Sequence, residues 1–461
     1  MTNPYRSLPS IDRLLADQRV APLVERYGRD AVLGIAREVI DEYRVRAEQT
    51  GALPERPPAE TVAERAQALE RSLRRVINAT GVVLHTNLGR APLSAAAIEA
   101  MAAAGRGYSN LEFDLDEGTR GSRFMHLANL LCRVTGAEAA AAVNNNAAAL
   151  LLSLSALATG GEVVISRGQL VEIGGGFRIP EVMRQSGARL VEVGTTNRTY
   201  LRDYAEAIGE QTVALLRVHA SNFRVVGFTE EAPLDGLVSL ARERGLLLID
   251  DLGSGALMDT RPYGLAGEPL VHDSVAAGTD VVLFSGDKLV GGPQAGIAVG
   301  KSEPIAAMLR HPLARALRMD KSSIAGLAAT LEHYARVEAT EEVPVWRMIS
   351  TPLDRLRRRA RRWARACADQ AEVVHGLSMI GGGSLPGEGL ESALCSVSHP
   401  QGADAFAAAL RVADPPVIAR IERDRVLLDP RTVDPAEDRL VEAALGRLCT
   451  PGPSTGDSTG R

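Results

Sequence analysis

The chain has 461 residues, of which 45% are hydrophobic and 24% charged, and its formal net charge is -5. This composition excludes a fibrous or disordered protein, and the charge argues against a generally basic nucleic-acid binder while leaving room for a local basic surface. The four cysteines lack metal-ligand spacing, which argues against a zinc site or a disulfide framework and indicates a reducing compartment. Because no signal-like or membrane-spanning stretch is evident, we expect a soluble, cytoplasmic protein without a bound metal.

The first part of the chain, residues 1–75, predicts a small helical module. Ser10 can cap a first short helix, and a longer amphipathic run covers Arg29 to Glu48. A Pro-rich break at residues 53–58 precedes a further helix, which we expect to continue through Arg75.

Short apolar strands alternate with helical stretches from residue 76 to about 340. This alternation predicts a mostly parallel α/β sheet covered by helices, with ligands bound at the carboxyl ends of the strands. We therefore expect residues 76–340 to form the larger domain. The strand candidates are Ala139–Val143, Glu162–Ser166, Arg189–Val193, Val213–Val218, Leu246–Asp250 and Asp280–Phe284.

The last part of the chain predicts a smaller α/β domain over residues 341–449. An Arg-rich helix from Leu353 to Gln370 leads into alternating short strands and helices. The tail at residues 450–461 is rich in Gly, Ser, Thr and Pro, and it is expected to be disordered.

A single lysine is presented after the strand candidate Asp280–Phe284. The chain has only three lysines, and one of them, Lys288, follows Asp287 and precedes a turn on the pair Gly291-Gly292. An amine displayed in this way can form a Schiff base, whereas the guanidinium of arginine stays protonated and is no nucleophile. An ordinary surface lysine is the alternative.

A pyridoxal phosphate group on Lys288 requires an acid for its ring nitrogen. The apolar run that begins at Leu246 ends in two carboxylates, Asp250 and Asp251. We favour Asp251 as the ring-nitrogen partner, with Asp250 as the fallback. Either carboxylate can instead be a helix cap or an ion-pair partner.

The same cofactor requires a cradle for its phosphate. Asn145, Asn146 and Ala147 follow a strand and open an Ala- and Leu-rich helix, whose N-terminal amides suit a phosphate; a plain cap and turn is the alternative. His219 follows another strand and can pack on the cofactor ring, or it can be a satisfied core histidine. The glycine loops at 174–176 and 194–197 are weaker candidates for ligand contact.

Three arginines form a candidate anion site. Arg315 and Arg318 are three residues apart, which predicts that both lie on one helical face, and Arg90 follows a glycine turn. Three guanidinium groups can bind an anion larger than a carboxylate. Solvated surface charge is the alternative in a chain this rich in arginine.

Taken together, these motifs resemble the bacterial selenocysteine synthase family, the L-seryl-tRNA(Sec) selenium transferases. The resemblance implies an aminotransferase-like, fold-type I pyridoxal phosphate-dependent transferase, with Lys288 as the Schiff-base lysine beside a catalytic Asp287. It further implies that Arg90, Arg315 and Arg318 bind selenophosphate. The matching segments are Leu8–Leu15, Asn78–Val83, Thr86–Pro92, Tyr108–Glu112, Gly118–Arg123, Asn144–Ala148, Ser285–Lys288 and Gly381–Gly387.

The resemblance also implies a substrate, partners and an assembly. The reaction is the conversion of seryl-tRNA(Sec) to selenocysteyl-tRNA(Sec), with the N-terminal module contributing to recognition of the tRNA. The family assembles as a ring of dimers, a homodecamer, and is not bound to membranes. One departure from the family pattern is Gln169, where glutamate is expected, although Glu172 remains close by.

Two other functions stay compatible with the residues. The first is a pyridoxal phosphate-dependent lyase or aminotransferase that acts on a free amino acid or amino sugar; a cysteine desulfurase is less favoured because no cysteine lies in an evident catalytic loop. The second is a non-catalytic RNA-binding scaffold. Turnover of a free substrate without RNA would support the first function, and absence of bound cofactor would support the second.

Overall fold

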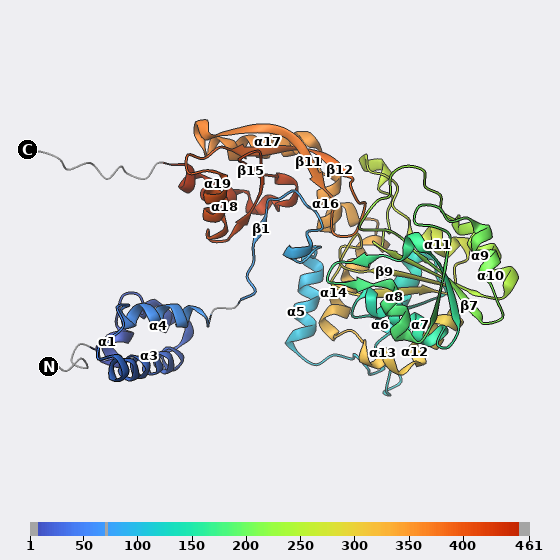
Figure 1. Cartoon of the computed structure of the whole chain (residues 1–461), viewed down its shortest axis with the longest axis horizontal. Helices are drawn as coiled ribbons and strands as arrows, with labels where there is room; N and C mark the ends of the chain where they lie inside the picture. The colour runs from blue at the N-terminus through green and yellow to red at the C-terminus, as the bar shows by residue number, and fades with distance from the viewer. Residues whose placement is uncertain (1–7, 70–71, 451–461) are drawn as a thin grey trace, which may run out of the picture. The chain divides into compact units, whose positions relative to one another are not determined.

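The computed structural model describes residues 8–69 and 72–450, and the expected disordered tail falls almost entirely outside them. The chain divides into two compact units, one within residues 1–75 and the other within residues 76–461. Figure 1 shows the helices and strands of both units. Within the described residues, no helix has both the length and the apolar character that crossing a membrane requires.

The first unit is a cluster of helices. Ser10 caps the first helix, as predicted, since its hydroxyl accepts the N–H of Arg13 at 3.3 Å. The last helix ends at Gln67, so the predicted continuation through Arg75 is wrong. Leu73 is 93% exposed, and a helix extended this far would have no apolar partner to stabilise it. The helices are α1 (Ile11–Leu15), α2 (Ala21–Tyr27), α3 (Arg29–Thr50) and α4 (Pro58–Gln67).

A seven-stranded sheet forms the centre of the second unit, in the order β2-β10-β9-β8-β7-β3-β6. All six predicted strands are present, with ends that differ from the prediction by up to three residues. Neighbours among β3, β6, β7, β8 and β9 are parallel. Strand β10 is antiparallel to both β2 and β9, so β2 also runs in the direction of the other five predicted strands. The strands are β2 (Ala139–Val143), β3 (Glu162–Ser166), β6 (Arg189–Val193), β7 (Thr212–Val218), β8 (Leu247–Gly253), β9 (Val281–Ser285) and β10 (Gly296–Gly300).

Strand β10 was not predicted from the sequence, because glycines bound its short apolar run. A Cβ at Gly296 would clash with the carbonyl oxygen of Asn145, and a Cβ at Gly300 would clash with that of Asp280. The glycines therefore allow β10 to pass close to the backbone at both ends. The local sequence pattern does not show that glycine is required at these two positions, because the backbone atoms that exclude a Cβ are far away in the sequence.

Helices cover both faces of the sheet, as predicted. Leu283 packs with α7, α8 and α12 on one face, whereas its neighbours Val282 and Phe284 pack with α6, α11 and α14 on the other. The helices of this domain are α5 (Ala95–Arg106), α6 (Met125–Thr135), α7 (Asn146–Leu157), α8 (Ile179–Ser186), α9 (Leu201–Ala207), α10 (Leu234–Arg244), α11 (Val271–Ala277), α12 (Ser302–Arg310), α13 (Pro312–Ala316), α14 (Lys321–Ala335), α15 (Ala339–Glu342) and α16 (Pro344–Ser350). A short hairpin pairs β4 (Glu172–Ile173) with β5 (Phe177–Arg178).

The C-terminal part contains an antiparallel sheet in the order β11-β12-β15-β14. The predicted Arg-rich helix is present, but it ends at Arg365, and a separate 3-10 turn spans Ala368–Gln370. The elements are α17 (Leu353–Arg365), β11 (Ala371–Met379), β12 (Gly389–Val397), α18 (Ala403–Arg411), β13 (Val417–Ile418), β14 (Arg420–Glu422), β15 (Arg425–Leu428) and α19 (Asp438–Cys449).

A disulfide joins Cys367 and Cys449, whose Cα atoms are 5.0 Å apart. The cysteine spacing argued against a disulfide framework, and it did not indicate this single pair. The two residues are separated by 82 positions in the sequence, and they meet because the last residues of α19 pack beside the end of α17. Cysteine spacing alone does not reveal such a meeting.

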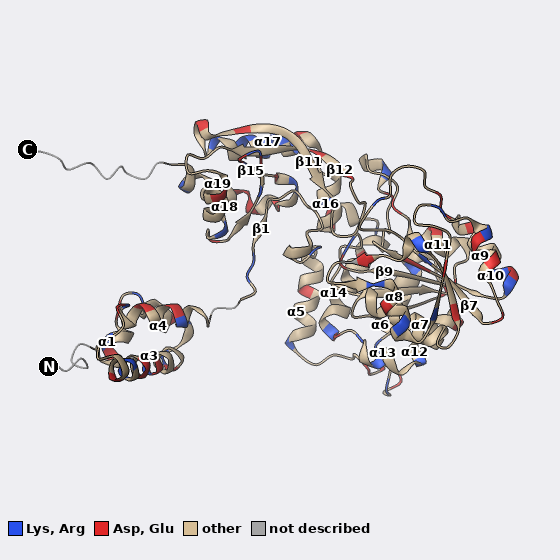
Figure 2. Ribbon diagram, viewed as in Figure 1, with Lys and Arg blue, Asp and Glu red and all other residues tan. Residues whose placement is uncertain are grey.

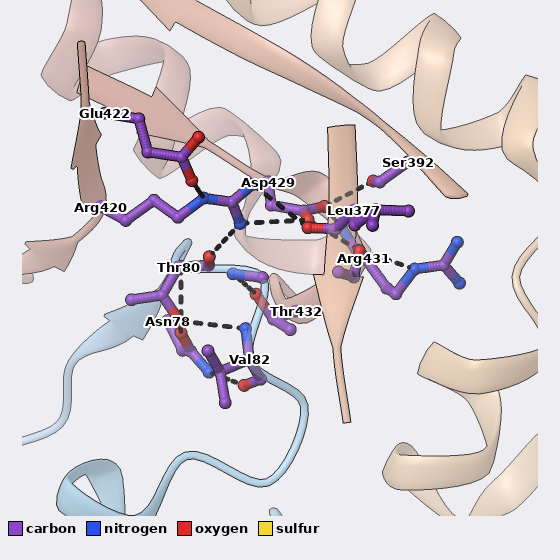
Figure 3. A network of polar contacts seen from close by, with 12 residues as sticks. Asn78, Thr80, Val82, Leu377, Ser392, Arg420, Glu422, Asp429, Arg431 and Thr432 are labelled. Atoms are coloured by element: carbon purple, nitrogen blue, oxygen red, sulfur yellow. Dashed lines mark hydrogen bonds and ion pairs between the residues drawn. The ribbon is translucent and has the colours of Figure 1, made fainter. Parts of the chain in front are cut away.

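The segment that begins at β1 (Ile77–Asn78) is bound first to the C-terminal part of the chain. Strand β1 pairs in parallel with β13. The fully buried carboxylate of Asp429 accepts hydrogen bonds from the hydroxyls of Ser378 and Ser392, at 2.7 and 2.8 Å, and Arg420 donates to the carbonyl of Thr80 at 2.6 Å (Figure 3). The pairing of β1 and the bond from Arg420 hold the start of the segment that continues to Arg90.

Candidate active site

The carboxyl ends of the parallel strands bring several of the predicted residues to one edge of the sheet. Asn145 follows β2, His219 follows β7, Asp251 lies near the end of β8, and Lys288 follows β9. Because β7, β8 and β9 are adjacent, the last three of these residues lie on neighbouring strands. The sheet topology thus brings these residues to one edge, at which the strand pattern predicts ligand binding.

Lys288 is buried, with 4% of its surface exposed. Its Nζ donates to the carbonyl oxygen of Gly383 at 3.4 Å. Burial lowers the pKa of the amine, and the positive charge of Arg90 lowers it further, while the carboxylates of Asp251 and Asp287 act in the opposite direction. The net lowering increases the share of the neutral, nucleophilic amine at a given pH.

The wall opposite Lys288 is a glycine loop from the C-terminal part of the chain. Gly381, Gly382 and Gly383 have φ angles of +70°, +58° and +80°, which disfavour any side chain. A Cβ at Gly383 would lie 3.0 Å from Nζ of Lys288, and a Cβ at Gly382 would clash with the carbonyl oxygen of Leu84. In the sequence this loop supports only the resemblance, although three consecutive glycines after a strand are a signal that could have assigned it to the site.

Asp251 and Asp250 have different environments. Asp251 accepts a hydrogen bond from Asn146 Nδ2 at 2.8 Å, and burial raises its pKa to about 6, an effect that this hydrogen bond and Lys288 partly oppose. Asp250 instead accepts hydrogen bonds from Arg217 at 3.1 Å and from the hydroxyl of Ser274 at 2.6 Å. The geometry therefore favours Asp251 over the fallback as the ring-nitrogen partner.

The N-terminus of α7 adjoins Asp251 through Asn146, the first residue of the helix. Asn145 is the cap residue, and its side-chain oxygen accepts the N–H of Ala148 at 2.9 Å. The capping alternative is thus correct for the Asn145 side chain, while the first-turn amides, including that of Ala147, retain the orientation that suits an anion.

The three arginines are held in different ways. Arg90 pairs with Asp287 at 2.7 Å, and Arg318 approaches Glu112 at 3.5 Å, whereas Arg315 is exposed on α13. The prediction that Arg315 and Arg318 share a helical face is wrong, because α13 ends at Ala316. The backbone at Arg318 is extended and forms a β-bridge with Val143, which places it beside the end of β2.

Gln169, the departure from the family pattern, is buried. Its side-chain oxygen accepts the N–H of Val218 at 3.0 Å, a bond that an amide and a carboxylate can both accept. Glu172 is exposed and pairs with Arg178 at 2.7 Å. Gln169 also lines a cavity of about 190 Å³ together with the loop Thr195–Asn197, while the loop 174–176 forms an exposed turn.

Buried polar atoms without hydrogen-bond partners mark the space around Lys288. Such atoms are uncommon in folded proteins, so a group of them at one edge indicates a polar ligand. Ser221 belongs to this group, and its hydroxyl and the Lys288 amine both lie within 4 Å of the Cβ positions of Gly253 and Gly383. The unpartnered atoms at these strand ends and neighbouring loops are Asn146 Oδ1, His219 Nε2, Ser221 Oγ, Ser254 Oγ, Glu268 Oε1 and Ser384 Oγ.

These residues fit pyridoxal phosphate. They offer a buried amine, a carboxylate near a helix N-terminus, and hydroxyl and amide groups that lack partners. In the described part of the chain, no group of three or more His, Cys, Asp or Glu side chains is arranged to hold a metal ion. Fold and site together define the class as fold-type I pyridoxal phosphate-dependent enzymes.

Comparisons with known proteins identify the family. The family model described as L-seryl-tRNA selenium transferase matches residues 76–434, and a model described as selenocysteine synthase N terminal matches residues 5–44. The chain belongs to the L-seryl-tRNA selenium transferase family.

Curated relatives of this family match the chain over nearly its whole length. A protein from Nitratidesulfovibrio vulgaris is 52% identical, covering 96% of this chain and 99% of its own. Proteins from Hyphomonas neptunium and Moorella thermoacetica are 48% and 49% identical, each over 96% of this chain and over 98% and 96% of their own. All three are named L-seryl-tRNA(Sec) selenium transferase.

A solved structure shares the fold. D-Glucosaminate-6-phosphate ammonia-lyase superimposes with a TM-score of 0.59 at 24% identity, over 82% of this chain and 96% of its own. At this identity the likeness concerns the fold alone.

Proposed function

We propose that this protein converts L-seryl-tRNA(Sec) to L-selenocysteyl-tRNA(Sec), with pyridoxal phosphate as its cofactor and selenophosphate as its selenium donor. The observation that carries the proposal is the buried amine of Lys288, with its lowered pKa, in a chain that matches the family model across this site. The names of the relatives supply the substrate.

The cofactor would be held by groups from four strand ends. Lys288 would bind it covalently, Asp251 would hold the proton of its ring nitrogen, and His219 would border the ring. Asn145, Asn146 and Ala147 would bind its phosphate through the start of α7. When bound, pyridoxal phosphate draws electrons from the α-carbon of an amino acid.

The residues around the cofactor would then move protons and hold the donor. The amine of Lys288, once free, takes the α-proton of the seryl group and later returns it. The β-hydroxyl leaves with a proton as water, a carbon–selenium bond forms, and hydrolysis of the selenium–phosphorus bond releases phosphate. Arg90, Arg315 and Arg318 would bind the phosphate part of selenophosphate, and Asp287 would orient Arg90.

The first unit would contribute to recognition of the tRNA. Basic and acidic residues both occur along α1, α3 and α4 (Figure 2). Such a surface suits recognition of RNA shape as well as phosphate. We further propose that the protein works in the cytoplasm as a homo-oligomer, a ring of dimers as in the family.

Turnover with two substrates tests this function. Seryl-tRNA(Sec) and seryl-tRNA(Ser) are supplied separately with selenophosphate, and the aminoacyl group released from each product is identified. We expect selenocysteine from seryl-tRNA(Sec) alone. Absence of selenocysteine from both, with cofactor loading established by visible absorbance, would refute the proposal and favour a free amino acid or amino sugar as the substrate.

A further inference from the structure

A buried carboxylate faces His219 at the edge of the cofactor site, and the mechanism above gives it no role. Oε1 of Glu268 lies 3.4 Å from Nε2 of His219. The side chain of Glu268 is 2% exposed, and neither of these two atoms has a hydrogen-bond partner among the described residues. A carboxylate so deeply buried is costly unless a donor or a cation compensates it.

The backbone holds both residues in place. The N–H of His219 donates to the carbonyl of Asp251 at 2.9 Å, which ties the end of β7 to β8. The N–H of Glu268 donates to the hydroxyl of Thr260 at 3.2 Å, within a loop that a bridge between Ala256 and Leu270 closes. The approach of the two side chains therefore follows from two fixed segments.

The charge of Glu268 also acts on the amine of Lys288. The carboxylates of Asp251 and Asp287 act in the same direction, while Arg90 acts with the opposite sign. The side chain of His219 is 23% exposed, in contrast to the buried Glu268. The imidazole is thus more accessible than the carboxylate that it faces.

We propose that Glu268 is a positioning residue that acts on the cofactor through His219. By accepting the Nε2 proton, its carboxylate fixes the tautomer and the plane of the imidazole that borders the cofactor ring. The 3.4 Å separation shortens to a hydrogen bond when the cofactor is bound, as polar contacts in active sites commonly do. This inference rests on the proposed function, since it requires pyridoxal phosphate at Lys288.

A double-mutant cycle tests the pair. Glu268→Gln keeps the shape of the side chain and removes its charge, and His219→Phe keeps a flat ring for packing but removes both nitrogens. Each variant and the combination are stripped of cofactor and titrated with pyridoxal phosphate, reading visible absorbance and the dissociation constant. Glu243→Gln, on the exposed side of α10, is the matched control.

We expect each single variant to weaken cofactor binding about tenfold and to alter the visible band, because one orienting charged hydrogen bond is lost. The combination should bind far less weakly than the product of the two single effects, because the positioning effect of Glu268 passes through the imidazole and only its smaller charge effect on Lys288 remains. Wild-type affinity and spectrum in Glu268→Gln, or effects that multiply to about a hundredfold in the combination, would overturn the proposal. A wild-type protein without any visible band would instead refute the cofactor assignment itself.

Thermal unfolding of the proteins saturated with pyridoxal phosphate provides a second measurement. His219→Phe leaves the buried carboxylate of Glu268 without its imidazole partner, so the midpoint temperature of unfolding of this variant should fall. Adding Glu268→Gln to His219→Phe should recover part of that loss. A combined variant that is less stable than His219→Phe alone would contradict the pairing.

Discussion

Nη1 of Arg90 lies 2.7 Å from Oδ2 of Asp287, across 197 residues of sequence. Arg90 has a left-handed φ of +63° directly after Gly89, so the turn aims its side chain at the residue that precedes Lys288. The guanidinium thereby contributes to lowering the pKa of the Lys288 amine. It also retains further N–H donors for an anion, which links the amine and the candidate donor site through one residue.

Replacement of the lysine should remove the cofactor bond. We expect Lys288→Ala to lack the visible absorbance of the bound cofactor and to lose turnover, because no other amine occupies that position. Absorbance spectra after cofactor addition and gel filtration provide the measurement. Lys321→Arg, at a half-buried lysine at the start of α14 whose Nζ donates to the carbonyl of Gly107 at 2.6 Å, should bind cofactor normally. An unchanged spectrum in Lys288→Ala would move the cofactor elsewhere.

The glycine loop offers a matched pair of substitutions. Gly383 and Gly387 have similar φ angles of +80° and +77°, so alanine should cost each about 1–2 kcal/mol of folding stability. Only Gly383→Ala places its Cβ 3.0 Å from the Lys288 amine, whereas the Cβ of Gly387→Ala has no neighbour within 4 Å. We expect Gly383→Ala alone to weaken cofactor binding, by tenfold or more. Equal cofactor affinities in the two variants would show that the loop does not form the wall of the site.

The raised pKa of Asp251 predicts how the stability of the cofactor-free protein depends on pH. Its folded pKa of about 6 exceeds the ordinary value of 3.8, so the folded protein binds a proton more tightly than the unfolded chain. The free energy of unfolding should therefore fall as pH rises from about 4 to 6, by about 3 kcal/mol from this group.

Asp251→Asn should flatten that decline and stabilise the cofactor-free protein at neutral pH, while turnover falls. Chemical denaturation at several pH values measures the effect. Asp250→Asn is the comparison, and it should destabilise the protein, because Asp250 is paired with Arg217. A pH dependence of stability between pH 4 and 6 that is the same in Asp251→Asn and the wild type would contradict this account.

The arginine on α13 tests the donor site. Arg315→Ala should raise the KM for selenophosphate about tenfold and leave cofactor loading unchanged, because an exposed guanidinium can contact an anion without supporting the fold. Arg310→Ala, also exposed and at the end of the preceding helix, is the control. Equal KM values for the two variants would place the anion elsewhere.

Local patterns were sufficient for much of the fold. Six strands followed from short apolar runs, and the cap at Ser10 from a hydroxyl before a helix, because these features depend on neighbouring residues. Strand β10 and the early end of α4 were missed, since a glycine-bounded strand and the lack of a packing partner depend on distant residues.

Residue types and their order in the sequence determined that Lys288 follows a strand, that carboxylates end another strand and that asparagines open a helix. Tertiary structure decided which groups meet. Asp251 rather than Asp250 contacts Asn146, Gly383 lies against the Lys288 amine, Cys367 meets Cys449, and Arg315 and Arg318 separate at the end of α13. In each case the packing of whole strands and helices decides whether two side chains lie close together, and the local spacing of residues in the sequence does not specify that packing.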